Sequence, residues 1–348
     1  MKDKKRRNLK ILLCLIYFSL VFLSKKKKHE KFFFFLQEKK NLNYCQNFGL
    51  MIYYEEKNKN LFRINSSGNI GDYIQSLAAL QFLPKNCFPY LIDRDHLRYY
   101  NGPVLNLIMN GWFPIYEGNK IVSDKINPIY ISFHIYNEKA LDSEAIKNFK
   151  KFEPIGCRDL FTYIVLKNNN IKSYFSSCLT LTLDIDYAAK DYERTNEIIF
   201  VDYSLGEIPQ VDETLYSLKA YKFKRIINLT HIYNMNEPHI ERFKKAKYLL
   251  DRYARAKLVV TTRLHAAFPC LALKTPVILV RTKKFFDQNR FSGLYKFLNT
   301  IGYNDHEKFE VKLKFDQRNH IINPNEYLKW GNKLKEILKA KINNIIIK

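Results

Sequence analysis

The chain has 348 residues, of which 47% are hydrophobic, 15% aromatic and 26% charged. That apolar content supports one large or two medium domains and excludes a disordered chain, which would lack enough apolar surface to offset its ordering entropy. The formal net charge of +24 favours anionic partners, but no zinc-finger, homeodomain or RNA-binding motif occurs, so we expect no nucleic-acid partner.

Positive charge is concentrated at the amino terminus, where residues 1–40 hold thirteen Lys and Arg against three acids. The apolar run Ile11–Leu23 is flanked by basic residues, and as a helix it reaches only about 20 Å, short of a roughly 30 Å hydrocarbon core. No small-residue cleavage site follows it. We therefore expect residues 1–45 to form a short anchor on an anionic membrane surface, with the body on the cytoplasmic side of the inner membrane. A plainly cytoplasmic protein with a basic tail is the alternative, and a lysine-rich composition explains the charge of the body equally well.

The six cysteines are scattered and form no CxxC pair, which favours neither a disulfide framework nor a zinc site. Cys157, Cys178 and Cys270 lie in apolar runs, where a free thiol behaves as a small core residue. A reducing compartment fits this pattern best. We expect no metal ion and no cofactor.

From about residue 46, short apolar runs alternate with segments of helical periodicity, which predicts an α/β fold. The apolar runs are continuous, as in buried parallel strands. Strands are expected at Met51–Tyr54, Leu61–Ile64, Leu105–Met109, Ile129–Phe133, Ile198–Asp202, Arg225–Leu229, Leu258–Thr262 and Val277–Val280. Helices are expected at Asp72–Phe82, Asp159–Lys167, Ile240–Ala256 and Glu326–Lys341.

A polar stretch, Asp186–Asn196, reads as a linker between two α/β halves. We predict Rossmann-like domains over residues 46–188 and 189–348, the second carrying a C-terminal helix. Two such halves imply a cleft, and ligands of open parallel sheets bind beyond the carboxyl ends of the strands.

Four segments at predicted strand ends carry candidate site residues. In Ser66–Asp72, Gly68, Asn69 and Gly71 let backbone N–H groups approach an anion, and Asp72 begins a helix. Asp72 fits a plain first-turn acid equally well. A lone Gly-x-x-Gly is a weak signal on its own.

His134 ends an apolar strand, and Arg158 and Asp159 lie at a strand-to-helix turn. Arg158 suits an anion clamp, because its planar guanidinium fits a carboxylate or phosphate; alternatively it pairs with Asp159, which would cap the next helix.

Arg263 and His265 follow the strand-like run Leu258–Val260. Burying both without partners would be costly, so they face either a cleft or nearby acids and carbonyls.

Taken together, residues 68–84, 110–113, 126–135, 153–183 and 256–280 resemble the polysaccharide pyruvyl transferase family in colinear order, over roughly residues 48–285. The resemblance implies a GT-B-like fold of two Rossmann-like domains and phosphoenolpyruvate as co-substrate. The implied reaction moves a carboxyethylidene group onto two hydroxyls of a cell-surface polysaccharide or its precursor, free or lipid-linked, and forms a cyclic ketal.

The resemblance also implies roles for individual residues. Arg263 and Arg158 would clamp the two anionic groups of the donor, while His265 or His134 would bind phosphate or donate a proton, and Asp72 would accept a proton from the acceptor. Two alternatives remain: a glycosyltransferase of the same architecture that uses a nucleotide sugar, and a non-catalytic glycan-binding protein at the membrane.

Overall fold

The computed structural model describes residues 44–53, 67–84, 88–113, 121–136, 138, 141–183, 194–218, 225–283 and 288–347. The predicted anchor in residues 1–45 therefore lies almost entirely outside the described residues. The same holds for the strand expected at Leu61–Ile64 and for most of the expected linker Asp186–Asn196. Among the described helices, none combines the length and apolar character needed to span a bilayer.

The first sheet is built from parallel strands in the order β3-β1-β4-β5-β6-β7. Its central strands β4 and β5 carry long apolar runs and are buried along nearly their whole length, as expected for strands covered on both faces. The strands are β1 (Tyr44–Ile52), β3 (Phe88–Asp93), β4 (Leu105–Phe113), β5 (Ile126–Ile135), β6 (Ile155–Cys157) and β7 (Ser173–Phe175).

The second sheet has the order β14-β13-β12-β11-β8-β9 and is parallel except for β14, which runs antiparallel to β13. Its strands are β8 (Glu197–Val201), β9 (Arg225–Leu229), β11 (Leu258–Thr261), β12 (Val277–Arg281), β13 (Asn299–Tyr303) and β14 (Phe309–Lys312). A separate antiparallel pair joins β2 (Ser67–Asn69), which precedes α3, to β10 (Ile232–Asn234), which follows β9.

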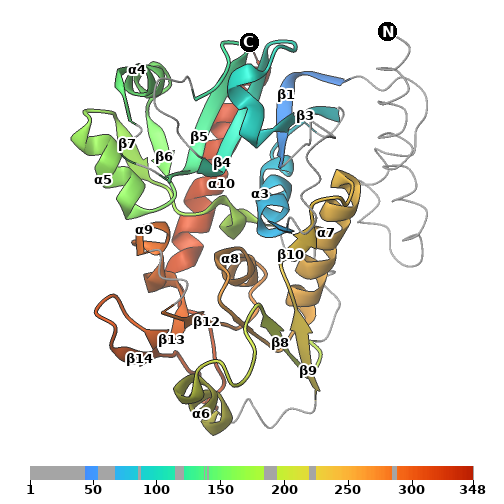
Figure 1. The fold of residues 1–348 in the computed structure, drawn as a ribbon, viewed down its shortest axis with the longest axis vertical. Helices are drawn as coiled ribbons and strands as arrows, with labels where there is room; N and C mark the ends of the chain where they lie inside the picture. The colour runs from blue at the N-terminus through green and yellow to red at the C-terminus, as the bar shows by residue number, and fades with distance from the viewer. Residues whose placement is uncertain are drawn as a thin grey trace.

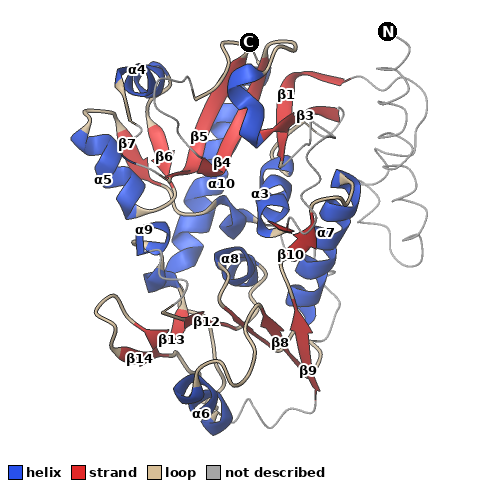
Figure 2. Cartoon of the chain, viewed as in Figure 1, coloured by secondary structure: helices blue, strands red, loops and turns tan. Residues whose placement is uncertain are grey.

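Figures 1 and 2 show the first sheet in the upper part of the molecule and the second in the lower part, with α8 and α9 between them. The helices are α3 (Gly71–Leu80), α4 (Ser143–Lys151), α5 (Leu160–Asn168), α6 (Pro209–Ser217), α7 (His239–Arg255), α8 (Leu264–Ala272), α9 (Gln288–Phe291) and α10 (Glu326–Ile346). Short 3-10 turns cover Arg94–Tyr99 (η1), Leu179–Thr182 (η3) and Tyr295–Phe297 (η6). Helix α3 is buried all round except at its last residue, which places it inside the molecule.

Helix α10 packs against both halves of the chain. The Trp330 ring meets Phe175 of the first half edge-on at 4.9 Å between centroids and Phe297 of the second half at 6.3 Å. Gly331 lies so close to the first half that a Cβ there would stand 3.1 Å from the carbonyl oxygen of Leu181. The predicted C-terminal helix thus forms part of the packing of both sheets.

The predicted α/β class, with parallel sheets and a C-terminal helix, is confirmed. Each of the seven expected strands within the described residues overlaps an observed strand, and each expected helix overlaps an observed helix. The strands β3, β6, β7, β13 and β14 were not predicted, because they are short or interrupted by proline, glycine and polar residues. The GT-B-like arrangement and the boundary between residues 188 and 189 remain predictions.

Arg242 of α7 fastens the second half to the first. Its buried guanidinium donates to the carbonyl oxygen of Tyr53 at 2.7 Å, to the Tyr73 hydroxyl at 2.9 Å and to the carbonyl oxygen of Glu237 at 2.8 Å. The Tyr73 hydroxyl also contacts Nδ1 of His239 at 2.6 Å. One side chain therefore satisfies buried acceptors on both sides of the junction.

We expect Arg242→Met to lower the free energy of unfolding by about 2–4 kcal/mol, because it leaves several buried acceptors without donors. The control is Lys245→Met on the same helix, whose half-exposed ammonium pairs with Glu237 at 2.6 Å. That change should cost less than about 1 kcal/mol. Urea unfolding of both variants measures the difference, and equal losses would contradict this role for Arg242.

Candidate functional site

The predicted glycine loop is fixed to the second half by its backbone. The N–H of Ile70 donates to the carbonyl oxygen of His231 at 2.7 Å, and the N–H of Gly71 donates to Oδ1 of Asn69 at 2.9 Å. We expected backbone N–H groups of this loop to face an anion, but these two are engaged within the chain. The role of Gly68, Asn69 and Gly71 in substrate binding therefore remains a prediction.

The structure shows why glycines stand at two of these positions. A Cβ on Gly68 would lie 2.3 Å from the Tyr233 ring, and a Cβ on Gly71 would lie 2.9 Å from Cβ of His265. Both distances are too short for any side chain without movement of the neighbour. Gly71 thus lets the first turn of α3 reach the first turn of α8, although the two helices belong to different halves.

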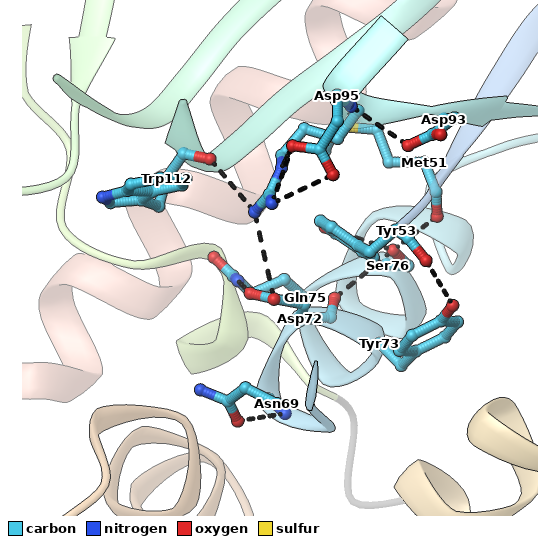
Figure 3. Close-up of polar contacts among 12 residues, drawn as sticks. Met51, Tyr53, Asn69, Asp72, Tyr73, Gln75, Ser76, Asp93, Asp95 and Trp112 are labelled. Atoms are coloured by element: carbon cyan, nitrogen blue, oxygen red, sulfur yellow. Dashed lines mark hydrogen bonds and ion pairs between the residues drawn. The ribbon is translucent and has the colours of Figure 1, made fainter. Parts of the chain in front are cut away.

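Asp72 is the second residue of α3, so it is a first-turn acid, and its side chain is largely buried. Gln75 donates to its Oδ1 at 3.2 Å, and Nη1 of Arg94 lies 3.9 Å from its Oδ2 (Figure 3). Burial raises the pKa of this carboxyl, while Arg94, Arg290 and Arg158 oppose the rise. A carboxyl with a raised pKa is suited to accept a proton near neutrality.

His134 ends β5 and is held by Asp159, the residue that caps α5. Nδ1 of His134 lies 2.7 Å from Oδ2 of Asp159, whose Oδ1 accepts the Thr162 N–H at 2.9 Å. The expectation that Asp159 caps this helix is confirmed. Burial and then Arg158 lower the pKa of His134, and Asp159 opposes the fall. The imidazole is therefore neutral at neutral pH, with Nδ1 turned to the carboxylate and Nε2 left to act on a ligand.

Arg158, at the end of β6, is fully buried. Its Nε lies 3.5 Å from Oδ2 of Asp159, so the expected pairing occurs as an ion pair. Within the part of the chain that the structure describes, none of its three guanidinium nitrogens makes a hydrogen bond. Such a group is costly to bury, and this cost is relieved when an anion supplies acceptors.

Arg263 is the N-cap residue of α8, and its partner comes from a neighbouring strand end. Its Nε lies 2.8 Å from Oδ2 of Asp202, which follows β8 with a left-handed backbone (φ +50°). The same Asp202 oxygen accepts the N–H of His231 at 3.1 Å. The sequence placed Asp202 at a strand end but did not identify it as the partner of Arg263.

His265 lies in the first turn of α8 and is 4% exposed. Its Nε2 has no hydrogen-bond partner among the described residues. Burial lowers the pKa of this histidine well below its usual value, and Arg158, Arg290 and His231 lower it further. Arg158 of the first half is thus among the charges that act on His265 of the second.

Two arginines act on three of the predicted residues. Arg158 influences the pKa of Asp72, of His134 and of His265, and so does Arg290, a residue that the sequence analysis missed. Arg290 belongs to α9, and the next residue but one, Ser292, accepts the N–H groups of Leu160 and Phe161 at the start of α5. These contacts draw a helix of the second half onto the strand end that carries Arg158.

No group of three or more His, Cys, Asp or Glu side chains suited to a metal ion occurs among the residues that the structure describes. The chemistry considered below is assigned to the side chains named above.

The buried histidines predict how stability depends on pH. Burial lowers the pKa of His231 to about 4 and also lowers the pKa of His134 and of His265. In the unfolded chain each titrates near 6.5, so below that pH the unfolded state binds more protons. We expect the free energy of unfolding to fall as pH drops from about 6.5 to 4, by up to about 1.4 kcal/mol per pH unit for each histidine. The raised pKa of Asp72 has the opposite effect, because it makes the free energy of unfolding rise as the pH falls. Urea unfolding at a series of pH values measures this, and a flat profile would contradict it.

Comparison with known proteins identifies the family of the chain. A solved structure of an uncharacterised protein from Klebsiella pneumoniae is similar at 16% sequence identity with a TM-score of 0.42, over 70% of this chain and 87% of that chain. No curated protein sequence matches the chain. A family model described as polysaccharide pyruvyl transferase matches residues 69–284, which is more than half of the chain. This match spans Asp72, His134, Arg158 and His265, and the chain belongs to the polysaccharide pyruvyl transferase family.

Proposed function

We propose that this transferase uses phosphoenolpyruvate as its donor and builds a cyclic pyruvate ketal on a sugar of a cell-surface polysaccharide or its precursor. The observation that carries the proposal is the fully buried guanidinium of Arg158, which influences His265; among the described residues, neither this guanidinium nor Nε2 of His265 has a hydrogen-bond partner. Phosphoenolpyruvate carries a phosphate and a carboxylate, which supply the acceptors that such a site lacks.

In the proposed reaction a proton adds to the methylene carbon of phosphoenolpyruvate and leaves an oxocarbenium-like centre at C2. A sugar hydroxyl attacks C2 and loses its proton, and the C2–O bond to phosphate then breaks. A second hydroxyl closes the ketal and releases a second proton. One proton has been added to carbon and the other leaves with inorganic phosphate, so the step needs no oxidant or reductant.

The surroundings of each residue indicate which step of the reaction it performs. His265 is neutral in the empty protein, and a bound dianion favours its charged form, so donor binding itself prepares it to hold phosphate or deliver a proton. His134, oriented by Asp159, is the second candidate for the proton donor. Asp72 accepts the proton of the attacking hydroxyl, since its pKa is raised toward that task.

Arg158 and Arg263 bind the two anionic groups of the donor in this proposal. They differ in the empty protein, because Arg263 already pairs with Asp202 while Arg158 has no hydrogen bond among the described residues. Removing Arg158 takes away a buried guanidinium without hydrogen bonds among the described residues, and Asp159 keeps its contacts with His134 and Thr162. Removing Arg263 instead breaks a hydrogen-bonded ion pair with Asp202.

Arg158→Met should weaken phosphoenolpyruvate binding by about 100-fold or more, while Tm of the empty protein stays unchanged or rises. Isothermal titration with phosphoenolpyruvate and thermal unfolding of the same samples give the two values. Arg225→Met, at the exposed edge strand β9, is the control and should bind as the wild type does.

Undiminished donor binding by the Arg158 variant would contradict the donor site. Turnover of a nucleotide sugar, with no phosphate released from phosphoenolpyruvate across a panel of oligosaccharide acceptors, would instead favour a glycosyltransferase.

We also propose that residues 1–45 hold the protein at the cytoplasmic face of the inner membrane. The support is the basic and apolar sequence of this segment. A chain that starts at Asn41 should move from the membrane fraction to the soluble fraction when cells are fractionated. Equal membrane association of both chains would contradict the anchor.

A further inference from the structure

Two aromatic side chains lie beside His134 at the carboxyl ends of the central strands β4 and β5. Trp112 is the last residue but one of β4 and pairs in register with His134, and Tyr136 directly follows β5. The two rings have centroids 5.0 Å apart with their planes inclined by 59°. Tyr136 is 59% exposed, a large value for an aromatic side chain beside a buried histidine. Trp112 is half-buried, so Tyr136 gives the pair its exposed surface, and such a surface beside a site is a place where a ligand gains contact area.

A β-bulge joins this pair to the helix that carries Asp72. The register between β4 and β5 slips between Met109 and Gly111, and Gly111 has a positive φ of +138°. A Cβ on Gly111 would stand 3.1 Å from Oε1 of Gln75, and Gln75 in turn donates to Asp72. The extra residue lies in β5, which advances three residues where β4 advances two, so the bulge re-aims the side chain of His134 beside Trp112.

Arg94 connects the Trp112 ring to the carboxylate of Asp72. Its guanidinium carbon lies 5.0 Å from the Trp112 ring centroid and 4.9 Å from that of Tyr53. Its Nη1 is 3.5 Å from the Trp112 carbonyl oxygen and 3.9 Å from Oδ2 of Asp72 (Figure 3). A cation placed over an aromatic face holds the ring in position. Trp112 is thus fixed at a set place relative to the proposed proton acceptor.

We propose that Trp112 and Tyr136 form the platform on which a pyranose ring of the acceptor saccharide rests, with its hydroxyls turned to Asp72. The inference deepens the proposed function and rests on it. A pyranose has a face of C–H groups and a rim of hydroxyls; the C–H face suits aromatic rings, and the rim suits Asp72 and Arg94.

The anionic donor is a poor occupant for the same surface. The faces of aromatic rings carry partial negative charge, so they disfavour phosphate and carboxylate. Arg158 and His265 offer those groups unsatisfied nitrogens instead. The aromatic pair therefore marks the acceptor side of the site, and the buried arginine marks the donor side.

The chain has two tryptophans, which allows a direct test by fluorescence. In a Trp330→Phe background Trp112 is the only tryptophan, and excitation at a wavelength that tyrosine does not absorb isolates its emission. Phe retains an aromatic ring where Trp330 packs in α10. The protein, with phosphoenolpyruvate present, is titrated with methyl β-D-galactopyranoside, methyl β-D-glucopyranoside and methyl α-D-mannopyranoside. At least one should change the emission saturably. Tyr136→Ala should weaken that binding about tenfold, Tyr136→Phe should retain it, and Tyr248→Ala, an exposed tyrosine on α7, should leave it unchanged.

Two results would overturn the platform: no saturable change with any of the three glycosides, or equal affinity in the Tyr136→Ala protein and its parent. Calorimetry with phosphoenolpyruvate on the same samples distinguishes failure of the platform from failure of the proposed function. Intact donor binding alongside either of these results removes the platform alone, whereas absent donor binding in the wild type removes the proposed function.

Discussion

The contact between Gly71 and His265 is the constraint on which the site depends. A side chain at position 71 would collide with the histidine, so the first turns of α3 and α8 meet only because a glycine stands there. This contact brings the first turn of α3, which carries Asp72, to the first turn of α8, which carries His265. Arg242 also holds the two halves together, since it donates hydrogen bonds to the carbonyl oxygen of Tyr53 and to the hydroxyl of Tyr73. Neither half alone contains the site, so its geometry is a property of their packing.

The site carries charges whose balance changes when a ligand arrives. Arg158 is buried without hydrogen bonds among the described residues, and burial lowers the pKa of both His134 and His265. Burying a guanidinium without hydrogen bonds is costly even beside the Asp159 carboxylate. In the proposed function, a dianionic donor supplies acceptors to Arg158 and favours the charged form of the histidines. Donor binding and protonation of the histidines are coupled in this proposal.

The sequence predicted those features that depend on neighbours along the chain. Apolar runs identified most of the long buried strands, and the residues that follow them, His134, Arg158 and His265, were recognised as candidates at strand ends. The partners were harder to predict, because each comes from another element. Arg94 follows β3, a strand interrupted by Pro89, and Arg290 lies in a four-residue helix beyond the segment that resembles the family. Likewise, nothing in the local pattern around Asp202 shows that it pairs with Arg263.

Helix α10 has a consequence for the order in which the chain can fold during synthesis. Its Trp330 and Gly331 pack against Phe175 and Leu181, which leave the ribosome long before it does. Until residues 326–346 emerge, the first sheet has an apolar surface without its cover, and contacts between segments so far apart form late because a long loop must close. A nascent chain therefore completes the whole second half of the sequence up to α10 with that surface open to chaperones and to other chains.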